Sequence, residues 1–149
     1  MPIWGAPRAI YFGVHAVSTE WFNRSVTAGL PLAGVPGTPD AASMAKHGAI
    51  STPASSVIDA IHLHQMEDGS SGNTTLEVYR YRKGVFTLIA NCTLAQGGGD
   101  NTYKAFTPVS KDLMSLKAGD YLYLQPTEIM TGNNVTFVDV HFKPRRITG

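Results

Sequence analysis

"TTLEVYRYRKGVFTLIANCTL", residues 74–94, is the stretch that decides the fold of this chain. In its first half, Leu76 and Val78 alternate with charged residues and tyrosines, which is the two-residue period of a half-buried strand. Lys83-Gly84 then predicts a turn, because glycine readily adopts a positive φ, and a second β-forming run follows. The stretch therefore predicts an antiparallel hairpin with one apolar face.

The same two-residue period recurs on both sides of this hairpin. It is clear in residues 57–65 ("VIDAIHLHQ"), 121–125 ("YLYLQ") and 135–142 ("VTFVDVHF"), and weaker in residues 103–109 ("YKAFTPV"). Glycine- and asparagine-rich turns separate these runs. Short strands divided in this way predict an all-β chain, an antiparallel β-sandwich or jelly roll.

Composition limits the functions that the chain can have. Its 149 residues suit one domain, and 15% charged residues with 15 Gly and 9 Pro argue against a helical bundle. A net charge of +1 gives no electrostatic reason to expect nucleic acid or an anionic membrane as a partner. No signal peptide or membrane span is expected, and Cys92, which has no other cysteine to pair with, is expected to be buried.

The first third of the chain has a different character. Six of the nine prolines lie in residues 1–52 or directly after them, which predicts an extended N-terminal arm before a β-sandwich domain of residues 53–149. Within the arm, Asp40 and Gly48 flank "AASMAKH" as N-cap and C′ residues, so one short helix is expected there. The arm is apolar enough to pack on something, either its own β domain or a neighbouring subunit.

A corner is predicted where "LMSLKAGDYLYLQP", residues 113–126, joins two apolar runs. Gly119 can reverse the chain and Asp120 can hydrogen-bond to nearby backbone. A nucleophile elbow would lead into a helix, whereas β-forming residues follow here, so Asp120 is interpreted as structural. A short helix over residues 110–117, capped by Ser110 and ended by Gly119, is an alternative that would still make Gly119 the reversal point.

The chain contains side chains of the kinds that bind metals or catalyse reactions, but their spacing in the sequence defines no active site. His62 and His64 share one face of a predicted strand and His141 lies on another, so the three histidines can in principle bind a divalent metal. We favour plain polar-face histidines and expect no metal, no cofactor and no catalytic residue. Six carboxylates also define no pair suited to glycoside hydrolysis: Glu67, Asp68, Glu77, Asp120, Glu128 and Asp139.

The tyrosines are more informative about surfaces. Tyr79 and Tyr81 project to one face of their strand, and Tyr121 and Tyr123 do so on another. If the two strands pair, the four rings form an aromatic patch. Such a patch fits a sugar-binding platform, a protein interface, or simple packing against the N-terminal arm.

Four stretches in this order resemble tailed-bacteriophage capsid decoration, or cement, proteins of the β-sandwich/jelly-roll type: "SSVIDAIHLHQ", "TTLEVYRYRKGVFTLIA", "LMSLKAGDYLYLQ" and "VTFVDVHF". The resemblance covers residues 55–142 and leaves out the arm. The "AGD" corner is also similar to corners in C1q/TNF-like jelly rolls and in phage fibre heads.

The resemblance implies a non-enzymatic virion protein that is made in the host cytoplasm. Its oligomers, commonly trimers, would sit on the outer capsid surface, bind the major capsid protein and stabilise contacts between capsid subunits. The arm would contact the capsid or a sister subunit, and deleting residues 1–52 would abolish attachment but leave the β domain folded. The expected interface residues of the arm are Ile3, Trp4, Tyr11, Phe12, Trp21, Phe22, Leu30 and Leu32.

Two other functions stay open on the sequence. One is a carbohydrate- or receptor-binding β-sandwich module, such as a phage fibre head, that uses the tyrosine patch or the loops around residues 67–73 and 96–101. The other is a hydrolase, which is disfavoured because no nucleophile and base have a suitable spacing.

Overall fold

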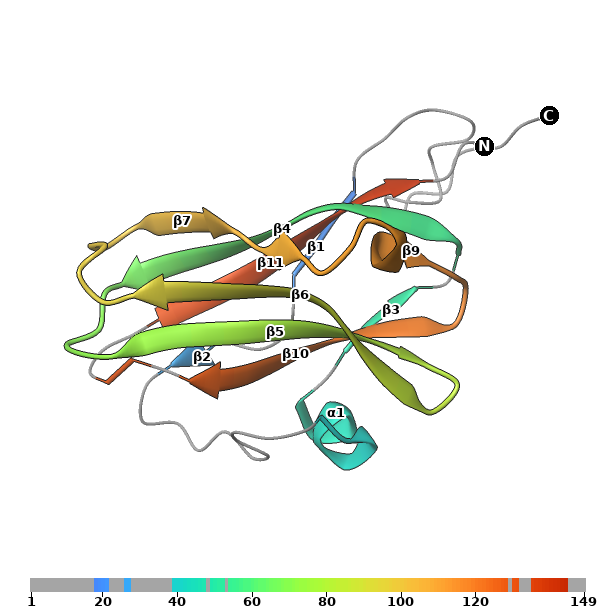
Figure 1. Ribbon diagram of the computed structural model, residues 1–149, viewed down its shortest axis with the longest axis horizontal. Helices are drawn as coiled ribbons and strands as arrows, with labels where there is room; N and C mark the ends of the chain where they lie inside the picture. The colour runs from blue at the N-terminus through green and yellow to red at the C-terminus, as the bar shows by residue number, and fades with distance from the viewer. Residues whose placement is uncertain are drawn as a thin grey trace, which may run out of the picture.

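The computed structural model shows two antiparallel β-sheets that enclose one hydrophobic core (Figure 1). It describes residues 18–21, 26–27, 39–47, 49–52, 54–128, 130–131 and 135–144. The first sheet contains β1 (Ser18–Trp21), β2 (Val26–Thr27), β4 (Ser56–Glu67), β7 (Thr102–Ala105), β9 (Ser115–Leu116) and β11 (Val135–Pro144). The second contains β3 (Ile50–Thr52), β5 (Asn73–Arg82), β6 (Val85–Ala95), β8 (Thr107–Pro108) and β10 (Asp120–Glu128). Helix α1 (Ala41–His47) and the 3-10 turn η2 (Asp112–Met114) complete the described elements.

The chain alternates between the two sheets as it proceeds. From β3 onward it passes to β4 in the first sheet, to the β5–β6 hairpin in the second, back to β7, and finally from β10 to β11. The central orders are β1-β11-β4-β7 and β3-β10-β5-β6-β8. Such alternation of antiparallel strands between facing sheets is a jelly-roll arrangement, so the predicted fold class is confirmed.

The hairpin predicted within residues 74–94 is present as β5 and β6. Their register pairs Arg82 with Val85, which leaves Lys83 and Gly84 as a two-residue loop. Both loop residues have positive φ, 48° and 83°, which matches the twist of the flanking strands. A bulge after Val78 shifts the register further along the hairpin.

Strand alternation divides core from surface as predicted. Ile61 and Leu63 of β4 are buried while the histidines between and beside them are partly exposed. The core-facing positions of the other long strands are also buried, and they form the centre of the core: Leu76, Val78, Leu122, Leu124, Val138, Val140 and Phe142. In β10 and β11 the alternation is incomplete, because Tyr123, Gln125 and Asp139 on the opposite faces are buried as well. Cys92 belongs to this core, as expected.

The short helix of the predicted arm is confirmed as α1, whose first backbone hydrogen bond runs from Met44 N–H to Asp40 O. The rest of the arm, as far as it is described, is not merely extended. Two stretches pair with β11 as β1 and β2, and a third pairs with β10 as β3. The division into an arm and a β domain at residues 52 and 53 stays a prediction, and three strands lie on its N-terminal side.

Two local expectations differ from the structure. The weak strand at residues 103–109 is two strands, because the chain leaves the first sheet after β7 and enters the second at β8. Buried Phe106 lies at this crossing, and its N–H donates to Ile61 O. The alternative helix over residues 110–117 is reduced to the single 3-10 turn η2, and Lys111 rather than Ser110 is its N-cap. Within the described part of the chain, no helix is long and apolar enough to cross a membrane.

Candidate functional site

The histidines come together on the outer face of the first sheet. β4 and β11 are neighbouring strands, and their register places His62 directly opposite Asp139. His64 and His141 each lie two residues away from one of this pair along their own strand. Because opposite residues share a face and side chains repeat every second residue, all four side chains belong to one group, here called the His–Asp cluster.

Asp139 is the centre of the His–Asp cluster. Its side chain is only 6% exposed, and its Oδ2 lies 2.9 Å from Nε2 of His141. Its Oδ1 lies 3.6 Å from Nδ1 of His62 and 3.4 Å from Nε2 of His64. Asp139 Oδ1 and His62 Nδ1 are buried, yet neither atom has a hydrogen-bond partner among the described residues.

The surroundings hold the rings in place and favour neutral imidazole at one position. Tyr103 of β7 packs against His62 and His64, with ring centroids 4.6 Å apart in both cases. Burial lowers the pKa of His62, and although Asp139 acts in the opposite direction, His141 and His64 add to the lowering.

Sequence reasoning found the three histidines but not the residue that joins them. Asp139 was counted among scattered carboxylates, because nothing in the sequence gives the register of β11 against β4. One signal was available: the spacing of Asp139 and His141 puts both on the same face of a strand. The pairing of β4 with β11 brings the three histidines and Asp139 together in one cluster.

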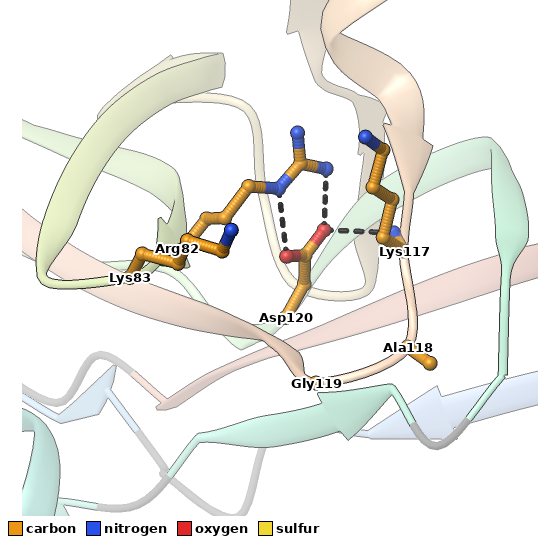
Figure 2. A pocket seen from close by; sticks show the side chains of 6 residues that line it. All are labelled: Arg82, Lys83, Lys117, Ala118, Gly119 and Asp120. Atoms are coloured by element: carbon orange, nitrogen blue, oxygen red, sulfur yellow. Dashed lines mark hydrogen bonds and ion pairs between the residues drawn. The ribbon is translucent and has the colours of Figure 1, made fainter.

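The "AGD" corner is a hydrogen-bonded structural unit, as interpreted from the sequence. Figure 2 shows Arg82 forming a two-pronged ion pair with Asp120, in which Nε donates to Oδ1 at 2.8 Å and Nη2 to Oδ2 at 2.6 Å. The backbone N–H of Lys117 also donates to Oδ2, at 2.8 Å. Gly119 has a φ of 89°, which glycine adopts without steric cost.

Thr52 of the neighbouring strand β3 also forms hydrogen bonds with the residues of this corner. The hydroxyl of Thr52 lies 2.6 Å from Asp120 O and 2.9 Å from Lys117 O, and Gly119 N–H donates to Thr52 O. The Arg82 pair lowers the pKa of Asp120, and the Lys117 N–H contributes in the same direction against the effect of burial. The carboxylate is therefore fully engaged in holding the turn and is not a nucleophile.

The four tyrosines of the predicted patch lie on one face of the second sheet. The register of β5 and β10 places Tyr121 opposite Tyr81 and Tyr123 opposite Tyr79. Phe86 of β6 completes the group: its ring centroid lies 4.6 Å from Tyr81 and 6.2 Å from Tyr123. We call these five rings the aromatic face.

The five rings of the aromatic face differ in their exposure to solvent. Tyr121 is 41% exposed and Tyr81 and Phe86 are partly exposed, whereas Tyr123 is completely buried. Tyr79 donates its hydroxyl hydrogen to Glu77, and burial, together with Glu77, raises the pKa of Tyr79 to about 12. Phe86 was missed from the sequence, although the two-residue turn before it predicts that it faces Tyr81.

The two glycine-rich loops considered for ligand binding lie together. Asp68 in the loop after β4 accepts hydrogen bonds from the N–H groups of Gly97 and Gly99 in the loop after β6. The side-chain amide of Gln65 donates to Asp68 and lies 3.3 Å from Gly99 O. Gln65 therefore contacts both loops and strengthens the link between them. These polar groups bind each other, so the loops form one interlocked end of the sandwich.

The predicted interface of the arm stays a prediction, because most of its residues lie outside the described part of the chain. Of the expected arm interface, only the backbone of Trp21 is described, in β1; the other seven residues lie outside the described parts. Among the carboxylates considered for hydrolysis, the buried Asp120 and Asp139 lie on different sheets. They therefore form no acid–base pair.

By its strand order, the chain is an antiparallel β-sandwich of the jelly-roll type. No protein-family model matches it, and no curated protein matches it. Among solved structures, it is similar to Eiger TNF from S. frugiperda, with a TM-score of 0.48 and 10% identity over 91% of this chain and 95% of that chain. At this distance the similarity carries no argument about function.

Proposed function

We propose that this protein is a non-enzymatic virion structural protein, a capsid decoration or cement protein. It attaches to the outer capsid surface, binds the major capsid protein and stabilises contacts between capsid subunits. It acts there as a homo-oligomer, with the trimer as the expected form. The observation that carries the proposal is the aromatic face on the second sheet.

The aromatic face has the composition of a protein-binding surface. Tyr121 is 41% exposed, and Tyr81, which is in ring contact with both Phe86 and Tyr121, is partly exposed, as is Phe86. The central parts of protein interfaces are rich in aromatic residues and poor in charge. A contiguous exposed group of this kind indicates a surface that is covered when the protein works.

The use of the buried carboxylates supports a non-enzymatic role. Asp120 is held by Arg82 and by the Lys117 N–H in a chain reversal. Asp139 is surrounded by His62, His64 and His141 on the opposite sheet. A covalent mechanism would need a nucleophilic side chain and a base within hydrogen-bond distance of each other.

The direct test is co-sedimentation with empty capsid shells assembled from the major capsid protein of the same genome. We expect saturable binding of the full chain and at least about a tenfold loss of affinity for the double variant Tyr121→Ser, Phe86→Ser. Met66→Ser, which changes a 50% exposed side chain on the other sheet, is the control and should bind normally. Light scattering on the free chain should give the mass of a trimer.

Absence of binding to shells would contradict the decoration role. Normal binding of the double variant would leave the role intact but remove the aromatic face as the contact surface. A monomer at all concentrations tested would contradict the trimer.

A carbohydrate- or receptor-binding module is the second candidate, and one observation favours it. The rings of Tyr81, Tyr121 and Phe86 lie close together, with Tyr81 inclined by 46° to Phe86 and by 50° to Tyr121, so they offer sugars an aromatic surface. Because Tyr123 is buried, Tyr121 is the informative position to change. Saturable binding on a glycan array that is lost in Tyr121→Ala, without binding to shells, would favour this candidate.

A further inference from the structure

We propose that the His–Asp cluster binds one divalent cation of the zinc class through His62, Asp139 and His141. His64, whose Nε2 lies 3.4 Å from Oδ1 of the same carboxylate, is the candidate for a fourth position. This site is on the first sheet, away from the aromatic face on the second, so it stands independently of the proposed function.

The donor set selects the class of ion. Two imidazole nitrogens and one carboxylate oxygen suit zinc and the neighbouring first-row metals. Calcium and magnesium require oxygen ligands in larger number, and the cluster offers a single carboxylate. Zn²⁺ is therefore the ion for which we argue.

The distances are those of a site that needs little rearrangement. One ligand atom from each of His62, Asp139 and His141 lies within 4.8 Å of the other two. Metal–ligand bonds of about 2.0–2.1 Å place tetrahedral neighbours roughly 3.3 Å apart. The carboxylate oxygens of Asp139 lie 2.9 Å, 3.4 Å and 3.6 Å from the nitrogens of the three histidines, on both sides of that value.

Two unsatisfied buried atoms favour a cation site at this position. Oδ1 of Asp139 belongs to a side chain that is 94% buried, and it has no hydrogen-bond partner among the described residues. Nδ1 of His62, 3.6 Å away, is also buried and unpartnered within the same part of the chain. Buried polar groups in native proteins are normally satisfied, and a cation between these atoms would satisfy both.

The scaffold around the cluster is rigid enough to preorganise the ligands. His62 and Asp139 face each other across adjacent strands in the interior of the first sheet, and Tyr103 packs on the ring of His62. Ligands on strands whose side chains are held by packing keep their geometry without the metal. A bound ion would also link β4 to β11, and would therefore stabilise the sheet.

The test is isothermal titration of Zn²⁺ into the full chain, purified without a histidine tag and stripped with a chelator. We expect one Zn²⁺ per chain. His62→Gln and His141→Gln should each weaken binding at least about 100-fold, since each removes a direct ligand. His47→Gln is the matched control, because His47 lies in α1 outside both sheets, and it should bind as the unchanged protein does.

The visible absorption of bound Co²⁺ distinguishes a site with defined coordination geometry from nonspecific metal binding at the surface. Co²⁺ added to the stripped protein should give the intense visible absorption of a four-coordinate ion, and His141→Gln should abolish it. Far-UV circular dichroism of each variant checks that the sheets remain; if His62→Gln does not fold, His141→Gln alone decides, because its side chain is 27% exposed. No stoichiometric Zn²⁺ binding, or equal losses in His47→Gln and His141→Gln, would overturn the site.

Discussion

Replacing Asp120 by asparagine should destabilise the protein by about 2 kcal/mol, because this carboxylate holds the chain reversal before β10. It accepts two hydrogen bonds from Arg82 and one from the Lys117 N–H, and its side chain is 3% exposed. Asparagine has the same shape but carries no charge, so it tests the ion pair and leaves the packing unchanged.

The magnitude follows from the exposure of the two partners. A hydrogen bond to a charged group contributes roughly 1.5–3 kcal/mol net, and two such bonds join Arg82 to Asp120. Arg82 is 28% exposed, so water takes over part of its solvation when the charge is removed. The amide oxygen of asparagine can still accept the Lys117 N–H. These two effects leave about 2 kcal/mol, or a fall in Tm of about 4–8 °C.

The dependence on pH gives the effect a second signature. Interaction with Arg82 lowers the pKa of Asp120 below its ordinary value of 3.8. The contribution of the ionised carboxylate is therefore complete above the unfolded pKa, and it is lost as the pH falls through the lower, folded pKa. The difference in stability between the natural protein and Asp120→Asn should be constant near neutral pH and shrink below about pH 4.

The assay is equilibrium unfolding in urea, followed by far-UV circular dichroism at several pH values. Asp59→Asn is the matched control, since Asp59 is exposed on β4 and its replacement should change stability by less than about 0.5 kcal/mol. If Asp120→Asn is no more destabilising than Asp59→Asn, or if the difference grows as the pH is lowered, the structural role given to this carboxylate is wrong.

Two substitutions and one labelling experiment test the same structure further. Thr52→Val removes the hydroxyl that bonds to the carbonyl groups of the corner and should cost about 1–2 kcal/mol in urea unfolding; no loss would show that β3 does not secure the turn. Gly119→Ala places a side chain at a φ of 89° and should cost about 1–2 kcal/mol in the same assay, whereas unchanged stability would contradict the positive φ. Cys92 is 3% exposed and burial raises the pKa of its thiol, so iodoacetamide should label it only in unfolding concentrations of urea, and rapid labelling of the folded chain would refute its burial.

The sequence was a good guide wherever the pattern was local. The alternation in β4, β5 and β11 predicted which side chains enter the core, and Lys83-Gly84 predicted the hairpin turn. Asp40 and Gly48 predicted the limits of α1 because capping depends on a few adjacent residues. The corner at Gly119 was predicted for the same reason.

The sequence was a poor guide wherever the outcome depends on register or on partners distant in the chain. Asp139 joins the histidines only because β11 pairs with β4 in one particular register, which no local pattern encodes. Residues 103–109 read as one strand because both halves have β-forming residues, although they belong to different sheets. β3 has only three residues, so its pairing with β10 depends on tertiary contacts rather than on propensity.

Electron cryo-microscopy of capsid shells saturated with the purified chain tests the proposed function most directly. The account predicts additional density on the outer surface, at junctions between capsid subunits, into which the two-sheet sandwich fits with the aromatic face of the second sheet against a protein surface. Shells that show no added density at saturating concentration, or density only inside the shell, would contradict it.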